Sequence, residues 1–271
     1  MMSQTLLASD GRRLGLIAAC AGAPLVLLHG VGMCAEAWAP QIEAFAATHR
    51  VIALDLPGHG ASDALPGRPQ LAEYVDWAAQ AVAGLGLGPV ALAGHSMGAL
   101  IALGLAIEHP GLVGRVALLN PVYRRDAAAR AAVLGRAQEL AAGRSDPEAP
   151  LARWFGPGEA PEVRARVGGW LRAVDPQGYA ATYAAFAAGD ATYADRLGEI
   201  RCPTLVLTGE HDGNSSPEMT RAIAAGVAHA QAVIVAGARH MTSLTAPDRV
   251  NAELARWLGL PEGTQAAGDA A

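Results

Sequence analysis

The sequence is poor in cysteine and in charged residues. Three cysteines occur in 271 residues, an odd number without the paired spacing of a metal site. Unpaired cysteines indicate reduced thiols, so we expect a cytoplasmic protein. Charged residues make up 17% of the chain and the net charge is −5. This balance argues against nucleic acid or an anionic membrane as a partner.

Long hydrophobic runs and a leader pattern are also missing. The most apolar stretch, residues 99–107, is far shorter than the roughly 20 residues that cross a bilayer. The opening stretch MMSQTLLASDGRR has no basic segment followed by an apolar one, so we expect no secretory signal. Hydrophobic residues nevertheless make up 52% of the chain. This composition is typical of a globular protein with a large core.

Six short apolar runs divide the chain, and each ends in Gly, Pro, Asp, Asn or His. They are residues 24–30, 50–60, 89–96, 115–121, 203–212 and 230–240. Continuous apolar runs are typical of strands buried on both faces, as in a parallel sheet covered by helices. Helix-like segments such as 71–86 and 100–113 alternate with them. The pattern predicts an α/β fold with a mostly parallel central sheet and helices on both faces. Residues 12–20 are expected to add an antiparallel edge strand.

One long segment interrupts this alternation. Residues 123–200 contain no convincing strand and read as helices rich in Ala, Arg and Glu. The segment is too long for a simple crossover, so we expect a helical cap over one end of the sheet. The chain then divides into a first core segment (1–122), the cap (123–200), a second core segment (201–262) and a disordered tail (263–271).

The pentapeptide GHSMG, residues 94–98, lies between a predicted strand and a predicted helix. So tight a turn forces its central residue into a strained backbone conformation, and neighbouring side chains would clash unless both flanking positions are glycine. Ser96 is thereby pushed out at the carboxyl end of the sheet, where α/β folds bind ligands. This placement predicts a nucleophilic serine.

A serine nucleophile needs a base and a group that orients the base. Asp212 and His240 each follow a predicted strand, in the chain order serine, acid, histidine. We therefore expect Ser96, Asp212 and His240 to form a catalytic triad at one edge of the sheet. Glu210, two residues before Asp212, is a rival for the acid. Asn120 follows another strand, but it carries no charge to orient an imidazole.

The loop HGVG, residues 29–32, follows the first predicted parallel strand. Backbone N–H groups of Val31 and Met97 are expected to form an oxyanion hole, which stabilises the charge that develops on the substrate oxygen. Cys34 lies near this loop without an apparent base, so we expect a buried small residue. His95 is expected to face away from Ser96 and to pack against the sheet.

Through HGVG, DLPGHGAS, GHSMG, TGEHD and GARHM, the chain resembles the α/β-hydrolase superfamily over residues 10–260. Within it, LARWFGPG, PEVRARVGGWLRAVDPQGYAATYAAFAAGD and IRCPTLVLTGEHD are similar to 3-oxoadipate enol-lactonases. The chain departs from those enzymes at NPVYRRDAAAR and at GARHMTSLTAPD. The resemblance implies that Asp55 and His59, in DLPGHGAS, are turn and packing residues.

Together, the motifs and the family resemblance predict a serine hydrolase that cleaves a small carboxylic ester or lactone through an acyl-enzyme on Ser96. Two alternatives stay open: a C–C bond hydrolase of a vinylogous diketone, and a non-catalytic ligand receptor with the same fold. The expected partner is the small-molecule substrate, and a homo-oligomer stays open. We expect no cofactor and no metal, because the sequence carries no motif for either.

Three further residues are candidates for substrate binding. Arg124 and Arg125 begin the cap, and a guanidinium there would suit a substrate carboxylate. The alternative is that both form the solvated basic start of a helix. Trp154, followed by Phe155, is expected either to line the substrate pocket or to pack between helices.

Overall fold

The computed structural model describes residues 2–8 and 10–259, so the tail predicted at 263–271 lies outside the described residues. The strands are β1 (Met2–Leu7), β2 (Arg13–Ala19), β3 (Ala23–Leu28), β4 (His49–Leu54), β5 (Val90–His95), β6 (Val113–Leu119), β7 (Thr204–Gly209) and β8 (Ala230–Val235). The α-helices are α1 (Ala39–Phe45), α2 (Leu71–Gly84), α3 (Met97–Glu108), α4 (Ala127–Ala141), α5 (Glu148–Trp154), α6 (Pro161–Ala173), α7 (Pro176–Gly189), α8 (Pro217–Gly226), α9 (Thr242–Thr245) and α10 (Pro247–Leu258).

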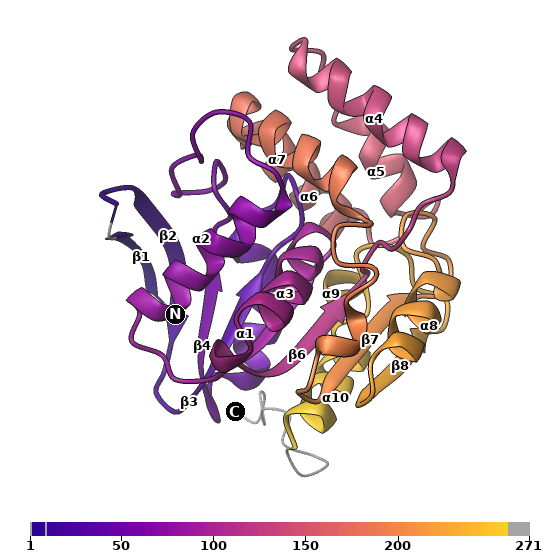
Figure 1. Cartoon of the computed structure of the whole chain (residues 1–271). Coiled ribbons are helices and arrows are strands. Elements are labelled where there is room, and N and C mark those ends of the chain that lie inside the picture. The colour runs from indigo at the N-terminus through magenta and orange to yellow at the C-terminus, as the bar shows by residue number, and fades with distance from the viewer. Residues whose placement is uncertain (1, 9, 260–271) are drawn as a thin grey trace, which may run out of the picture.

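All eight strands form one sheet in the order β1-β2-β4-β3-β5-β6-β7-β8 (Figure 1). β2 pairs antiparallel with β1 and β4, and all other neighbours are parallel, which confirms the predicted fold class. The expectation that residues 12–20 form the edge strand was wrong, because β1 pairs along β2 and lies outside it. β1 is largely exposed, and it therefore lacks the apolar run that reveals the inner strands.

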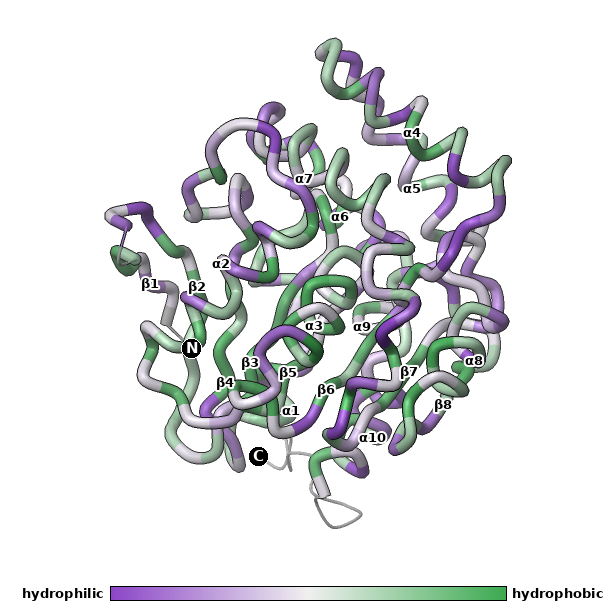
Figure 2. Tube along the Cα trace, viewed as in Figure 1, coloured by the Kyte–Doolittle hydropathy of each residue, from purple (hydrophilic) through white to green (hydrophobic). Residues whose placement is uncertain are grey.

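The inner strands contact a separate apolar layer on each face. In β3, Val26 and Leu28 pack in the cluster that contains α2 and α3, whereas Leu25 and Leu27 pack in the cluster that contains α1 and α10. Figure 2 shows the resulting hydrophobic centre along β3, β5 and α3. Burial on both faces explains why these strands read as continuous apolar runs. Although α3 is almost wholly buried, no helix within the described residues is long and apolar enough to span a membrane.

The order of the strands creates a crevice at the centre of the sheet. β3 lies between β4 and β5, so the chain leaves β3 toward one side and later returns on the other. Loops that follow such neighbouring strands diverge at their carboxyl ends and leave space for a ligand. The loop after β3 carries residues 29–34, and the turn after β5 carries Ser96.

Helices α4 to α7 lie between β6 and β7 in the chain, and we call residues 123–200 the cap. Within the described residues, no strand falls between 120 and 203, as the sequence predicted. α4 packs against α7, and α5 packs against α6. Figure 1 shows these four helices gathered at one end of the molecule. The cap touches the core at the amino end of α7, where Gly178 meets the backbone of Gly58.

Candidate active site

The turn between β5 and α3 holds Ser96 in a strained conformation, with φ 54° and ψ −111°. A Cβ atom at Gly94 would overlap the carbonyl oxygen of Gly98, and one at Gly98 would overlap the carbonyl oxygen of Leu28. Both glycines are therefore required by the close approach of backbone to backbone. The turn has the geometry of a nucleophile elbow. Ser96 is only 4% exposed beneath the cap.

The three residues predicted as a triad lie together at the carboxyl edge of the sheet. His240 Nδ1 lies 2.8 Å from Asp212 Oδ2, and His240 Nε2 lies 3.3 Å from Ser96 Oγ. Because an ionised carboxylate only accepts, the proton of a neutral His240 lies on Nδ1. Nε2 then carries the lone pair that accepts the Ser96 proton. The longer distance to Ser96 is typical of a site without substrate.

Asp212 sits in a dense set of hydrogen-bond donors. Its Oδ1 accepts the backbone N–H groups of Asn214 at 2.8 Å and Ser215 at 3.0 Å. Its Oδ2 accepts from His240 and from the Asn120 side chain, each at 2.8 Å. Burial acts to raise the pKa of Asp212, but the charge and hydrogen bond of His240, with Asn120 and Asn214, outweigh it and leave the pKa below its usual value. Asp212 therefore stays ionised beside the imidazole.

Asn120 supports the acid, a function that its lack of charge obscured in the sequence. It is fully buried with φ 50°, and Thr242 Oγ1 donates to its Oδ1 at 2.5 Å. This bond fixes the amide so that Nδ2 faces Asp212. The rival acid Glu210 is 51% exposed and accepts the N–H of Gly237, so it lies at the surface. The position of Asn120 at the carboxyl end of β6, beside β7, is the signal that could have revealed it.

The two N–H groups predicted for the oxyanion hole are both available. No hydrogen bond among the described residues uses the N–H of Val31 or Met97. The loop that carries Val31 is held by two histidines, since His29 Nε2 accepts the Leu56 N–H and His59 Nε2 accepts the Gly32 N–H, each at 2.9 Å. Burial lowers the pKa of His29 to about 4 and that of His59 to about 3, so both are neutral acceptors near pH 7. The packing function expected for His59 is confirmed.

Asp55, the other residue expected to form a turn, organises the same region. Its Oδ1 accepts the Ala35 N–H at 2.7 Å, and its Oδ2 accepts the Ala61 N–H at 2.9 Å. The carboxylate thereby joins the loop after β3 to the loop after β4. Burial raises the pKa of the nearby Cys34 thiol to about 12, so it stays protonated near pH 7. A protonated thiol is a poor nucleophile.

His95 is buried, as expected, and it supports the base directly. Its Nε2–H donates to the backbone carbonyl of His240 at 2.8 Å, and the two rings lie 5.0 Å apart. Burial, followed by repulsion from His240, lowers the pKa of His95 to about 3. A neutral His95 places no second positive charge beside the imidazole when His240 takes up a proton.

Of the three cap candidates, Trp154 contacts His240. Its ring stacks on the His240 imidazole with the centroids 5.7 Å apart and an angle of 29° between the planes. The Trp154 ring therefore covers one face of the imidazole. Phe155, the next residue, is buried in the hydrophobic core.

The two arginines that open the cap lie in different environments. Arg124 is 49% exposed and pairs with Asp195 at the surface. Arg125 is buried, lies over the Phe186 ring at 4.4 Å and pairs with Asp190 at 3.5 Å. The backbone N–H of Arg125 also donates to the Asp190 side chain. Asp190 therefore joins the beginning of the cap to the end of α7. Arg124 thus follows the solvated alternative, whereas Arg125 does not.

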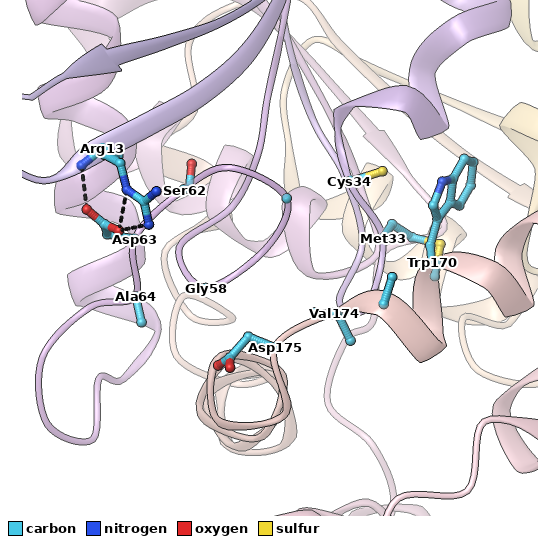
Figure 3. A pocket seen from close by; sticks show the side chains of 12 residues that line it. Arg13, Met33, Cys34, Gly58, Ser62, Asp63, Ala64, Trp170, Val174 and Asp175 are labelled. Carbon is cyan, nitrogen blue, oxygen red and sulfur yellow. Dashed lines mark hydrogen bonds and ion pairs between the residues drawn. The ribbon is translucent and has the colours of Figure 1, made fainter.

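A cavity of about 500 Å³ opens beside the loop of residues 29–34 after β3, which we call the oxyanion loop (Figure 3). Met33 and Cys34 line it from the core, and Trp170, Val174 and Asp175 line it from the cap. Ser96 and His240 are not part of its lining. Within the described residues, no group of three His, Cys, Asp or Glu side chains is arranged to hold a metal ion.

Comparison with known proteins agrees with this geometry. The sequence model of the Alpha/beta hydrolase family matches residues 25–253. The chain belongs to this family. This α/β-hydrolase is 50% identical over 259 residues to the (E)-2-((N-methylformamido)methylene)succinate hydrolase of Acinetobacter baylyi, covering 95% of this chain and 98% of the relative. The protein is a hydrolase of the α/β fold.

Solved structures of other α/β-hydrolases have the same architecture. A thermophilic esterase from Thermogutta terrifontis, described with malate bound, superposes with a TM-score of 0.86 at 26% identity, covering 96% of this chain and 98% of the esterase. The enol-lactonase of Burkholderia xenovorans superposes with a TM-score of 0.85 at 26% identity, covering 94% of this chain and the whole enol-lactonase chain. The predicted similarity to enol-lactonases therefore extends to the fold.

Proposed function

We propose that this α/β-hydrolase works through an acyl-enzyme on Ser96. The observation that carries the proposal is the unbroken path from Ser96 Oγ through His240 to Asp212, with the unused N–H groups of Val31 and Met97 beside the serine. A strained serine, a base with its lone pair toward that serine and two free donors are the parts that acyl transfer needs.

In the first half of the reaction, Ser96 Oγ attacks the carbonyl carbon and its proton passes to His240 Nε2. The N–H groups of Val31 and Met97 bind the oxygen that becomes negative. The bond from the carbonyl carbon to the leaving heteroatom then breaks, and His240 returns the proton to the leaving group. Water next gives a proton to His240 and its hydroxyl to the acyl carbon. The bond from that carbon to Ser96 Oγ then breaks, and His240 returns the proton to Ser96 Oγ as the acid leaves.

For the substrate, we propose a small compound with a succinate skeleton whose acyl group sits on a heteroatom conjugated to a double bond. The Acinetobacter relative is named for a formamide on a methylenesuccinate, and malate is likewise a four-carbon dicarboxylate. In that formamide, the nitrogen lone pair is shared with the double bond, which weakens the amide resonance and improves the leaving group. An enol-lactone, the substrate class of the Burkholderia neighbour, has the same feature with oxygen in place of nitrogen.

The test uses (E)-2-((N-methylformamido)methylene)succinate with the purified protein. We expect one formate and one (methylamino)methylenesuccinate for each water consumed, followed by NMR, and no formate from Ser96→Ala. A fluorophosphonate should label Ser96 alone and stoichiometrically. Ser243→Ala is the matched control, because Ser243 is as buried as Ser96 and lies outside the predicted triad.

A fluorophosphonate adduct at another serine, or none on folded protein, contradicts the acyl-enzyme and favours the receptor alternative. Turnover of a vinylogous 1,5-diketone, without turnover of the formamide, an ester or a lactone, assigns C–C bond hydrolysis instead. Turnover of esters or lactones alone retains Ser96 as the nucleophile and overturns the formamide as substrate.

A further inference from the structure

Asn120 lies where three segments of the chain meet beside Asp212. It follows β6 directly and is fully buried. Its backbone N–H donates to the Leu207 carbonyl of β7 at 2.6 Å, and its own carbonyl accepts from the Ser215 hydroxyl at 2.6 Å. The main chain of Asn120 is therefore held at both polar atoms, so its side chain begins from a fixed position.

The side chain of Asn120 joins the acid to the segment that carries the base. Its Nδ2 donates to Asp212 Oδ2 at 2.8 Å and to the backbone carbonyl of Arg239 at 3.4 Å. Its Oδ1 accepts from Thr242 Oγ1 at 2.5 Å. Arg239 precedes His240 and Thr242 follows it by two residues. The amide therefore contacts the chain on both sides of the base.

These contacts close a ring of hydrogen bonds around the acid–base pair. His240 Nδ1 and Asn120 Nδ2 both donate to Asp212 Oδ2, and Thr242 ties Asn120 to the segment that carries His240. A movement of His240 relative to Asp212 must therefore lengthen or break one of these bonds. The ring restrains the distance between the base and the acid.

The Thr242 hydroxyl determines whether the ring stays closed. In the observed orientation of the amide, Asp212 receives a proton from Nδ2 and Oδ1 receives one from Thr242, so both ends of the Asn120 side chain are satisfied. Thr242 is fully buried, so solvent does not supply another donor to Oδ1. A non-polar side chain at position 242 would leave Oδ1 as a buried acceptor without a donor, which folded proteins rarely tolerate. Rotation of the amide toward another donor would then weaken its bond to Asp212.

We propose that Thr242 is a positioning residue of the reaction, which acts through Asn120 to hold Asp212 and His240 in contact. The proposal rests on the proposed function, in which His240 carries the proton of Ser96. Small displacements of a catalytic group are costly to the rate. Because Thr242 is buried and bonded to Asn120, its loss should lower kcat rather than raise KM.

Thr242→Val tests the proposal, because valine keeps the shape of threonine without the hydroxyl. With p-nitrophenyl acetate, we expect kcat to fall about tenfold and KM to stay within about twofold of wild type. Thr242→Ser, which retains the hydroxyl, should keep at least about half of the wild-type kcat. Thr220→Val is the matched control, since Thr220 is also fully buried and its Oγ1 has no hydrogen-bond partner among the described residues. We expect wild-type kcat from this control, and circular dichroism verifies the fold of each variant.

A double-mutant cycle tests whether the effect passes through Asn120. Asn120→Gly removes the amide and permits the φ of 50° at this position. In that background, Thr242→Val should lower kcat by less than about twofold, because the bond that it removes is already absent. An equal fall in both backgrounds overturns the proposal. An unchanged kcat in Thr242→Val, an equal fall in Thr220→Val, or a Thr242→Ser variant as slow as Thr242→Val also overturns it.

The contact between His240 and Asp212 can be observed without substrate. An imidazole proton held by a carboxylate gives a downfield ¹H NMR signal, which is assigned to His240 by its absence from His240→Gln. We expect this signal to shift or broaden in Thr242→Val and to be unchanged in Thr220→Val; an unchanged signal in Thr242→Val overturns the proposal. If Ser96→Ala retains wild-type ester hydrolysis while the signal still changes in Thr242→Val, the proposed function fails and the positioning by Thr242 holds.

Discussion

At the scale of single residues, the charge of Asp212 is the feature on which the site depends. The carboxylate is buried, yet four donors surround it and keep its pKa below the usual value. Asn120 and His240 donate to the same oxygen of Asp212, so the Asn120 hydrogen bond restricts rotation of the carboxylate. The carboxylate can then hold the imidazole in one tautomer and stabilise its protonated form.

Asp212→Asn should leave the fold intact and lower turnover by roughly 10⁴-fold, as the equivalent change does in serine proteases, because the amide favours the wrong tautomer of His240. Steady-state kinetics on p-nitrophenyl acetate measure this, with circular dichroism to verify the fold. Glu210→Gln is the control, and we expect near wild-type turnover because Glu210 lies at the surface. A nearly active Asp212→Asn beside an inactive Glu210→Gln would reassign the acid.

At the scale of elements, the position of α7 determines the shape of the site. Gly178 packs directly on Gly58, and a Cβ atom at Gly178 would overlap the Gly58 carbonyl oxygen and lie 2.6 Å from its Cα. Backbone atoms cannot swing aside as a flexible side chain can. Tyr179, the next residue, covers the oxyanion loop, so any displacement of α7 also moves the Tyr179 ring relative to that loop.

Gly178→Ala should therefore lower kcat/KM at least about tenfold, since small misplacements of binding groups are costly to catalysis. Gly169→Ala, on α6, is the matched control because a Cβ atom there meets no other atom within 4 Å. We expect this control to keep full activity and to stabilise the protein by about 0.5–1 kcal/mol, as alanine is the better helix former. Kinetics and urea unfolding of both variants provide the comparison, and full activity in Gly178→Ala would show that α7 can shift without consequence.

At the scale of the whole molecule, three neutral histidines connect the loops at the carboxyl edge of the sheet. His29 joins the loop after β3 to the loop after β4, His59 binds the oxyanion loop and His95 binds the backbone of His240. Burial lowers the pKa to about 4 for His29 and to about 3 for His59 and His95. Each must remain unprotonated for the folded arrangement to persist.

Because the folded pKa values lie below the ordinary 6.5, the unfolded chain binds more protons as the pH falls below 6.5. The free energy of unfolding should therefore decrease on acidification, by up to about 1.4 kcal/mol per pH unit for each histidine, until the pH approaches about 4 for His29 and about 3 for His59 and His95. Urea unfolding at pH 7.5, 6.5 and 5.0 measures the slope. His59→Gln, whose amide oxygen can accept the Gly32 N–H, should reduce that slope by about a third. A stability that is flat between pH 6.5 and 5.0 would contradict the neutral, buried state of these residues.

The sequence by itself determined the features that depend on neighbouring residues. Continuous apolar runs predicted the strands that are buried on both faces, and the glycines around Ser96 predicted the turn because its strain is local. Chain order and strand ends then placed Asp212 and His240 at the same edge. The exposed strand β1 was missed for the corresponding reason, since a strand without burial carries no apolar pattern.

Only the tertiary structure decided which distant side chains meet. Asn120 and Asp212 are 92 residues apart, and Trp154 reaches His240 from another layer of the molecule. Arg124 and Arg125 are neighbours in the chain, yet one lies at the surface and the other is buried against Asp190. Local sequence patterns encode periodicity and turn geometry. The contacts named here depend on which strands are neighbours in the sheet and on how α4 to α7 pack over it, and no local pattern contains either.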